Sequence, residues 1–151
     1  MEWKIGIDTI AHKTAIIEKG KTIAVISCGF NNISKKENIN MYYEIIESGG
    51  LVVSEYALDE KTKAAHFGER NRIVSGISIG VLVIEANYRS GTIAAARLAE
   101  EQDKKIFAIP YAIDKVHSVG TNKLIQQGAI PTTDIKDIIN EFGFLNNKDI
   151  H

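Results

Sequence analysis

The sequence predicts an α/β fold, with a doubly wound, mostly parallel sheet and helices on both faces. Short runs of β-branched and other apolar residues, such as Gly80–Glu85, are apolar throughout, as strands covered on both faces are. Helix-length segments with polar starts and glycine or polar ends alternate with these runs. Short connections between such elements are typical of right-handed strand–helix–strand crossovers, which place helices on both faces of one sheet.

In the first half of the chain, glycines follow two of the predicted helices. A helix over 9–19 ends at Gly20 and precedes a strand at 22–27, and a helix over 38–48 ends at Gly49-Gly50 and precedes a strand at 51–54. Glycine after a helix is a common stop signal because it adopts the left-handed conformation without steric cost. The next helix is predicted over 69–77, preceded by a basic loop.

The second half repeats this alternation. The most apolar run, 80–85, is followed by an alanine-rich helix over 91–102 and a strand at 105–109. The remaining predicted elements are a helix at 122–127, a short strand at 129–132 and a helix at 134–142. Residues 145–151 are expected to form a frayed tail.

Charge composition limits the function classes. The 151 residues include 18 Lys and Arg against 19 Asp and Glu, for a formal net charge of -1. This balance excludes a globally basic nucleic-acid coat and an acidic disordered tail. Any site for a polyanion is therefore expected to be a local patch.

The cysteine count and the hydropathy pattern predict a cytoplasmic protein. The single cysteine, Cys28, cannot form an internal disulfide or a Cys-based zinc site, and it ends an apolar strand as a small buried residue would. No apolar run approaches the roughly 18 to 20 residues of a membrane span, and the first residues do not resemble a secretion signal.

The turn that opens the alanine-rich helix is a candidate phosphate site. Ligands of open parallel sheets bind at the carboxyl ends of the strands, where this turn lies. Ser90, Gly91 and Thr92 offer backbone N–H groups, two hydroxyls and a helix N-terminus, and Arg89 beside them favours an anion. The alternative is that Ser90 only caps the helix and Gly91 eases a tight turn.

The segment 61–72 is a candidate site for single-stranded nucleic acid. It carries four basic residues and one acid, with Phe67 among them on a predicted loop. Basic side chains follow a phosphate backbone, and an exposed aromatic ring stacks on a base. The alternative is a solvated helix start with Phe67 in the core.

Two further positions carry weaker signals. Lys123 is predicted in the first turn of its helix, where the dipole disfavours a cation unless an anion binds there; the alternative is an ordinary exposed lysine. Asp8 and His12 have a spacing that suits a metal or an acid–base pair, but Asp8 as a helix N-cap is favoured. We predict no metal site and no cofactor.

Recognised catalytic motifs are not found in the sequence. It contains no nucleophile elbow, no Walker-type Gly-Lys-Ser, no motif of paired carboxylates and no glycine-rich dinucleotide turn after the first strand. The sequence therefore predicts a binding protein and no enzyme.

The chain contains the motifs Gly6-Ile7-Asp8-x-x-Ala11-His12, Phe67-x-x-Arg70-Asn71-Arg72-Ile73, Val83-x-Glu85-Ala86, Arg89-Ser90-Gly91-Thr92 and Gly120-Thr121-Asn122-Lys123-Leu124-Ile125. Together these motifs resemble the DNA-processing protein A family, also called DprA or Smf. The resemblance runs from about residue 5 to residue 142. It implies a Rossmann-like fold that binds single-stranded DNA, protects incoming strands in natural transformation, helps to load the recombinase RecA, and forms a homodimer.

The resemblance also implies roles for individual residues. Those expected to contact DNA or its phosphates are Lys63, Phe67, Arg70, Arg72, Arg89, Ser90, Gly91, Thr92 and Lys123. Those expected to support the site are Asp8, Asn71, Glu85 and Asn122. We expect the contact residues to form one groove at the carboxyl ends of the strands.

The sequence departs from the family pattern in several places. The pattern begins two strands earlier, no winged-helix domain follows residue 142, and Tyr111 follows Pro110 where the family has glycine. We therefore expect an N-terminally truncated member: a partial Rossmann-like domain over 1–142 and a tail over 143–151. A missing central strand would expose a sheet edge, so self-association and weak DNA binding are expected.

Two alternatives to DNA binding are considered. Lysine-decarboxylase-like phosphoribohydrolases share this sheet, but they carry Pro-Gly-Gly-x-Gly-Thr-x-x-Glu where this chain has residues 89–95 without the extra glycines or the glutamate. The other alternative is a non-catalytic nucleotide-binding module.

Overall fold

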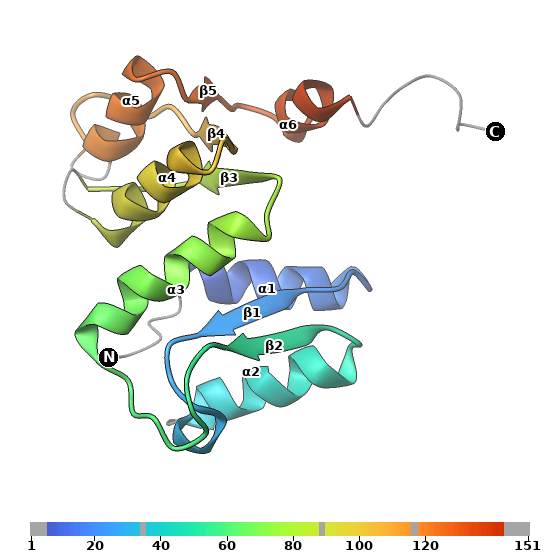
Figure 1. The fold of residues 1–151 in the computed structure, drawn as a ribbon. Coiled ribbons are helices and arrows are strands. Elements are labelled where there is room, and N and C mark those ends of the chain that lie inside the picture. Colours follow the sequence, from blue (N-terminus) through green and yellow to red (C-terminus); the bar gives the residue numbers. More distant parts are fainter. Residues whose placement is uncertain (1–5, 34–35, 88–89, 116–117, 144–151) are drawn as a thin grey trace. The chain divides into compact units, whose positions relative to one another are not determined.

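The computed structural model describes residues 6–33, 36–87, 90–115 and 118–143 (Figure 1). The chain divides into two compact units, Met1–Val74 and Ser75–His151, and each is described by itself. One helix, α3 (Ala64–Gly76), contains residues of both.

The first unit is built around two parallel strands. β1 (Ile23–Ile26) pairs with β2 (Leu51–Ser54), with Ile23 opposite Leu51. The other elements are α1 (Ile7–Ile17), the 3-10 turn η1 (Phe30–Asn32), α2 (Lys36–Glu47) and most of α3. The core consists of Ala24, Met41, Ile45 and Val52, because α2 packs its apolar face onto β2.

The second unit contains a three-stranded parallel sheet in the order β3-β4-β5. Its strands are β3 (Gly80–Val83), β4 (Lys105–Ala108) and β5 (Ile130–Pro131). Its helices are α4 (Gly91–Glu101), α5 (Ser118–Gln126) and α6 (Ile135–Phe142). α4 packs on β3 and β4, and α5 packs on β4; the core consists of Val83, Ala86, Ala96, Ala108 and Leu124.

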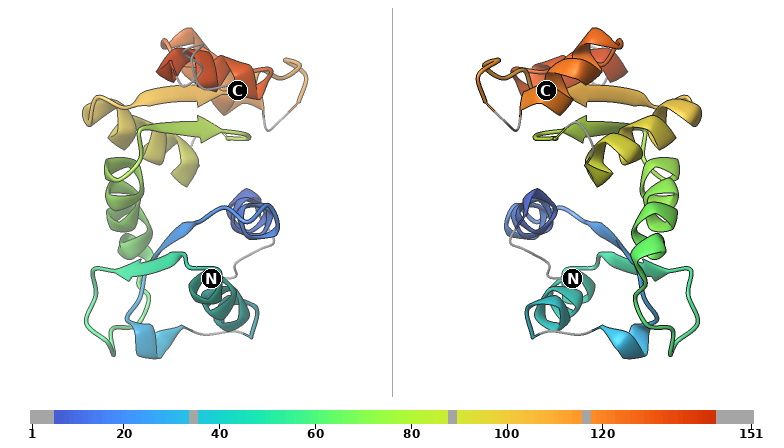
Figure 2. Two further views of the ribbon diagram at one scale, coloured as in Figure 1. Left: turned by 90° about the vertical axis from the view of Figure 1, so that its right-hand side faces the viewer. Right: turned by 90° about the vertical axis from the view of Figure 1, so that its left-hand side faces the viewer.

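The prediction of an α/β fold with parallel strands is confirmed. Among the residues that the structure describes, hydrogen bonds join the strands into two sheets, whereas the sequence pattern predicted one (Figure 2). Most predicted elements match within two or three residues, and Cys28 is buried as expected. The predicted tail lies outside the described residues.

Three local predictions were wrong. The N-cap of α1 is Gly6, so Asp8 lies in the first turn, where a carboxylate favours the helix dipole without capping. α3 begins at Ala64, so Phe67 is helical. α5 begins at Ser118, so Lys123 lies in the last turn, where the dipole favours a cation and no bound anion is needed to explain it.

The helices of the described part of the chain include none that is long and apolar enough to cross a membrane. The longest, α3, has 13 residues.

Candidate nucleic-acid interface

The start of α4 has the features of an anion site. Ser90 is the N-cap residue, in an extended conformation, but its side chain makes no capping hydrogen bond. Its Oγ is buried and has no hydrogen-bond partner among the described residues. A Cβ added at Gly91 would meet nothing within 4 Å, and Thr92 is exposed. The first N–H groups of α4 thus lie beside open space at Gly91, where an anion can be accepted, and the neighbouring Ser90 hydroxyl is buried with no partner among the described residues.

The first half of α5 is tied to the loops that follow β3 and β4. The N–H of Gly120 donates to the carbonyl of Ala86 at 2.9 Å. A Cβ at Gly120 would lie well inside 3.0 Å of that same carbonyl, so only glycine permits this approach. Asn122 receives the N–H of Tyr111 at 3.2 Å and donates to its carbonyl at 3.0 Å. Through these contacts α5 is bonded to the loops at the carboxyl ends of two neighbouring strands, β3 and β4 (Figure 1).

Two arginines predicted to bind phosphate lie on α3, and both have protein partners. Arg70 is half-buried and donates from Nη1 to the carbonyl of Val25 at 3.0 Å, while its buried Nε has no partner in the described part of the chain. Arg72 is exposed and forms an ion pair with Glu55. Arg70 is therefore held against β1 by a hydrogen bond. The Glu55 carboxylate offsets part of the positive charge of Arg72.

The positive segment 61–72 is offset by acids just before and within it. Lys63 pairs with Glu60, an exposed ion pair that raises the pKa of the lysine and lowers that of the glutamate. Over residues 55–72, four basic side chains stand against four acidic ones. The surplus of positive charge in 61–72 is thus not a free positive patch, because two acidic side chains that precede the segment form ion pairs with two of its cations.

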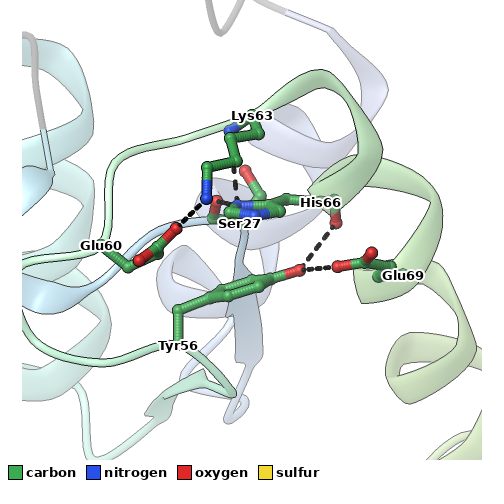
Figure 3. Close-up of polar contacts among 6 residues, drawn as sticks. All are labelled: Ser27, Tyr56, Glu60, Lys63, His66 and Glu69. Atoms are coloured by element: carbon green, nitrogen blue, oxygen red, sulfur yellow. Dashed lines mark hydrogen bonds and ion pairs between the residues drawn. The ribbon is translucent and has the colours of Figure 1, made fainter.

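A group of polar contacts around the side chains of Tyr56 and His66 holds the start of α3 in place (Figure 3). We call it the Tyr56–His66 cluster. The ring of Tyr56 stacks on that of His66 with 4.0 Å between centroids and 17° between planes. The Tyr56 hydroxyl donates to Glu69 Oε2 at 2.9 Å, and burial together with this bond raises the pKa of Tyr56 to about 12. The buried His66 places Nδ1 3.0 Å from the carbonyl of Ser27 and 3.3 Å from the N–H of Lys63. The cluster joins β1, the loop after β2 and α3.

His12 lies beside Asp8 and Arg70 in the first unit. Its Nδ1 is 2.6 Å from Thr22 Oγ1, and burial lowers its pKa, which Asp8 raises and Arg70 lowers further. Within 6–33, 36–87, 90–115 and 118–143, no cluster of three or more potential metal ligands occurs. The described role of His12 is thus a hydrogen bond between its side chain and that of Thr22.

The remaining predicted site residues fall into three groups. Arg89 lies outside the described residues. Glu85 and Lys123 are exposed in the second unit, and Asn71 is half-buried on α3 in the first. A single groove would combine residues of both units, and it stays a prediction.

Sequence reasoning missed the Tyr56–His66 cluster and the contact between Tyr111 and Asn122. Tyr56 and His66 are ten residues apart in no motif, so no sequence signal marks their stacking. Tyr111 was marked only by the departure at Pro110-Tyr111.

Comparison with known proteins identifies a family for the chain. The model of the family described as DNA recombination-mediator protein A matches residues 4–143. Protein Smf of Escherichia coli is 43% identical over 92% of this chain and 37% of its own length. DNA processing protein DprA of Streptococcus pneumoniae is 42% identical over 92% of this chain and 49% of its own length. The chain thus spans half or less of these relatives.

Two solved structures have the same fold. The X-ray structure of DNA processing protein A from Streptococcus pneumoniae matches with a TM-score of 0.81 and 40% identity, over 90% of this chain and 48% of that one. DNA processing protein A from Helicobacter pylori, described for its single-stranded DNA binding mode, matches with a TM-score of 0.80 and 32% identity, over 92% and 62%.

Proposed function

The chain belongs to the DNA recombination-mediator protein A family, and on this premise we propose that it binds single-stranded DNA. The finer parts of the proposal are that it protects incoming strands, assists a RecA-type recombinase, acts as a homodimer in the cytoplasm and catalyses no reaction. Support comes from the Helicobacter pylori relative, whose structure concerns single-stranded DNA binding.

The observation that carries the proposal is the start of α4. A buried polar atom without a partner costs about 1–3 kcal/mol, and a phosphate oxygen accepting from Ser90 Oγ would remove that cost. Gly91 leaves space for the phosphate to approach the N–H groups of the helix. The site thus suits the repeated phosphate of a nucleic-acid strand.

Ser90→Ala is expected to weaken binding of labelled oligo-dT about 10- to 100-fold, because a hydrogen bond to a charged group contributes about 1.5–3 kcal/mol. The urea midpoint should stay unchanged or rise, because the lost hydroxyl has no partner within the protein among the described residues. Fluorescence anisotropy and urea unfolding of the same variant measure both effects. Normal binding by the variant would contradict a phosphate contact at Ser90.

The matched control is Ser48→Ala. The Ser48 hydroxyl donates to the carbonyl of Ile45, at the end of α2. Its loss should lower stability slightly and leave DNA affinity unchanged. Wild-type affinity should also grow with oligonucleotide length and fall with salt, whereas equal affinity for AMP and oligo-dT would favour a mononucleotide module.

Arg72→Ala is expected to weaken binding of all DNA sequences alike and to reduce the salt slope, since each lost phosphate contact removes about 0.7 from the slope for a single strand. The ion pair with Glu55 supplies a sharper variant. Glu55→Gln should raise affinity, because it releases Arg72 from its carboxylate. Anisotropy titrations at several salt concentrations measure both variants.

Phe67→Ala separates stacking from charge on the same helix. A stacked ring contributes about 1–3 kcal/mol per base without changing the number of released counterions, so affinity should fall at constant slope. An unchanged salt slope in Arg72→Ala would show that Arg72 does not contact phosphate.

A further inference from the structure

Tyr111 follows β4 at the level where Ala86 follows β3. Val83 and Ala108 are register partners at the ends of these parallel strands, and the N–H of Ile109 donates to the carbonyl of Val83. Ala86 and Tyr111 each lie three residues beyond that pair. The two loops therefore leave the same edge of the second unit's sheet, the edge at which α4 begins.

The backbone of Tyr111 is held by a side chain of α5. Asn122 pairs with both its N–H and its carbonyl, and Gly120 on the same helix is bonded to Ala86. Pro110, directly before it, fixes another backbone angle. The position of residue 111 is thus set by backbone contacts that do not involve its ring.

Tyr111 is 38% exposed. A large aromatic group that is partly open to solvent, on a backbone fixed at both polar atoms, loses little further freedom when a flat partner covers it. The start of α4, where the Ser90 hydroxyl has no partner among the described residues, belongs to the same edge. Hydrogen-bond donors for a phosphate and an aromatic ring together match the alternating phosphate and base of a single strand.

We infer that Tyr111 is a base-stacking residue, on whose ring a nucleobase of bound single-stranded DNA lies while the neighbouring phosphate occupies the start of α4. The inference rests on the proposed function and adds a second kind of contact to it. The clamp by Asn122 makes Asn122 a positioning residue for this ring. Because every base has a π-face, the contact predicts affinity without sequence preference.

The test compares Tyr111→Ala with Tyr111→Phe in the full 151-residue chain, using labelled oligo-dT and an abasic oligonucleotide of equal length. Tyr111→Ala should weaken oligo-dT binding about 5- to 100-fold at an unchanged salt slope, as expected for one lost stack. Binding of the abasic strand should stay unchanged. Tyr111→Phe should bind both strands like the wild type, because it keeps the ring.

Tyr43→Ala is the matched control, since Tyr43 is an exposed tyrosine, 56% accessible, on α2 of the first unit. Its affinity for both strands should equal that of the wild type. Normal oligo-dT binding by Tyr111→Ala, or an equal loss for both strands, would overturn the stacking role and leave DNA binding itself standing. A wild-type chain that binds neither strand would overturn the proposed function together with this inference.

Discussion

Replacing Phe107 with alanine is expected to lower the free energy of unfolding by about 3–5 kcal/mol. Phe107 is 1% exposed and lies on β4, the central strand of its sheet. Its ring packs against that of Phe142 with 5.6 Å between centroids, and Gly80 leaves room for both rings. Truncation removes these contacts and opens a cavity that the surrounding strands cannot close. Urea unfolding followed by circular dichroism measures the loss.

Ile113→Ala serves as the control for Phe107→Ala. Ile113 is 93% exposed in the loop after β4, so shortening its side chain removes almost no buried apolar surface. Its urea midpoint should equal that of the wild type. A loss below about 1 kcal/mol in Phe107→Ala would show that this ring is not central to the second unit's core.

Gly29→Ala is expected to destabilise the first unit by about 3 kcal/mol or more, at the upper end of overpacking effects. The backbone of Gly29 is extended, with φ −68° and ψ 155°, so any residue could adopt its conformation. Space is the limit, because a Cβ there would lie well inside 3.0 Å of backbone atoms of Ala57 and Leu58. The hydrogen bond from the N–H of Gly29 to the carbonyl of Glu60 would have to open.

Gly68→Ala is the opposite case on α3. A Cβ at Gly68 meets nothing within 4 Å, so alanine should stabilise the helix by about 0.5–1 kcal/mol. Urea midpoints of the two variants should therefore move in opposite directions. Equal urea midpoints for Gly29→Ala and the wild type would mean that the loop at 57–60 can move away from the added methyl group without loss of stability.

The sequence predicted the elements well where apolar periodicity and glycines agree. β2 was predicted with its observed bounds, because an apolar run directly follows Gly49-Gly50. The start of α3 was missed by five residues because the basic segment around Phe67 was interpreted as a loop. The division of the strands into two sheets depends on hydrogen bonds between distant segments, which periodicity does not encode.

The candidate site was predicted less completely than the fold. The position of Ser90 to Thr92 after a strand followed from sequence order, but the lack of a partner for the Ser90 hydroxyl among the described residues did not. The pairing of Arg72 with Glu55 joins residues 17 positions apart and offsets part of the expected charge surplus. Such contacts depend on how the loop after β2 packs against α3, so local composition could not predict them.

The clamp on Tyr111 has a consequence for how this family can diversify. Asn122 forms hydrogen bonds with the backbone N–H and the backbone carbonyl of residue 111, and every residue except proline possesses both groups. Exchanging the side chain there leaves these hydrogen bonds intact, so a glycine or another ring could be carried on the same scaffold. The proposed base contact can therefore be altered by a single substitution at residue 111, while Asn122 continues to hold the backbone that presents it.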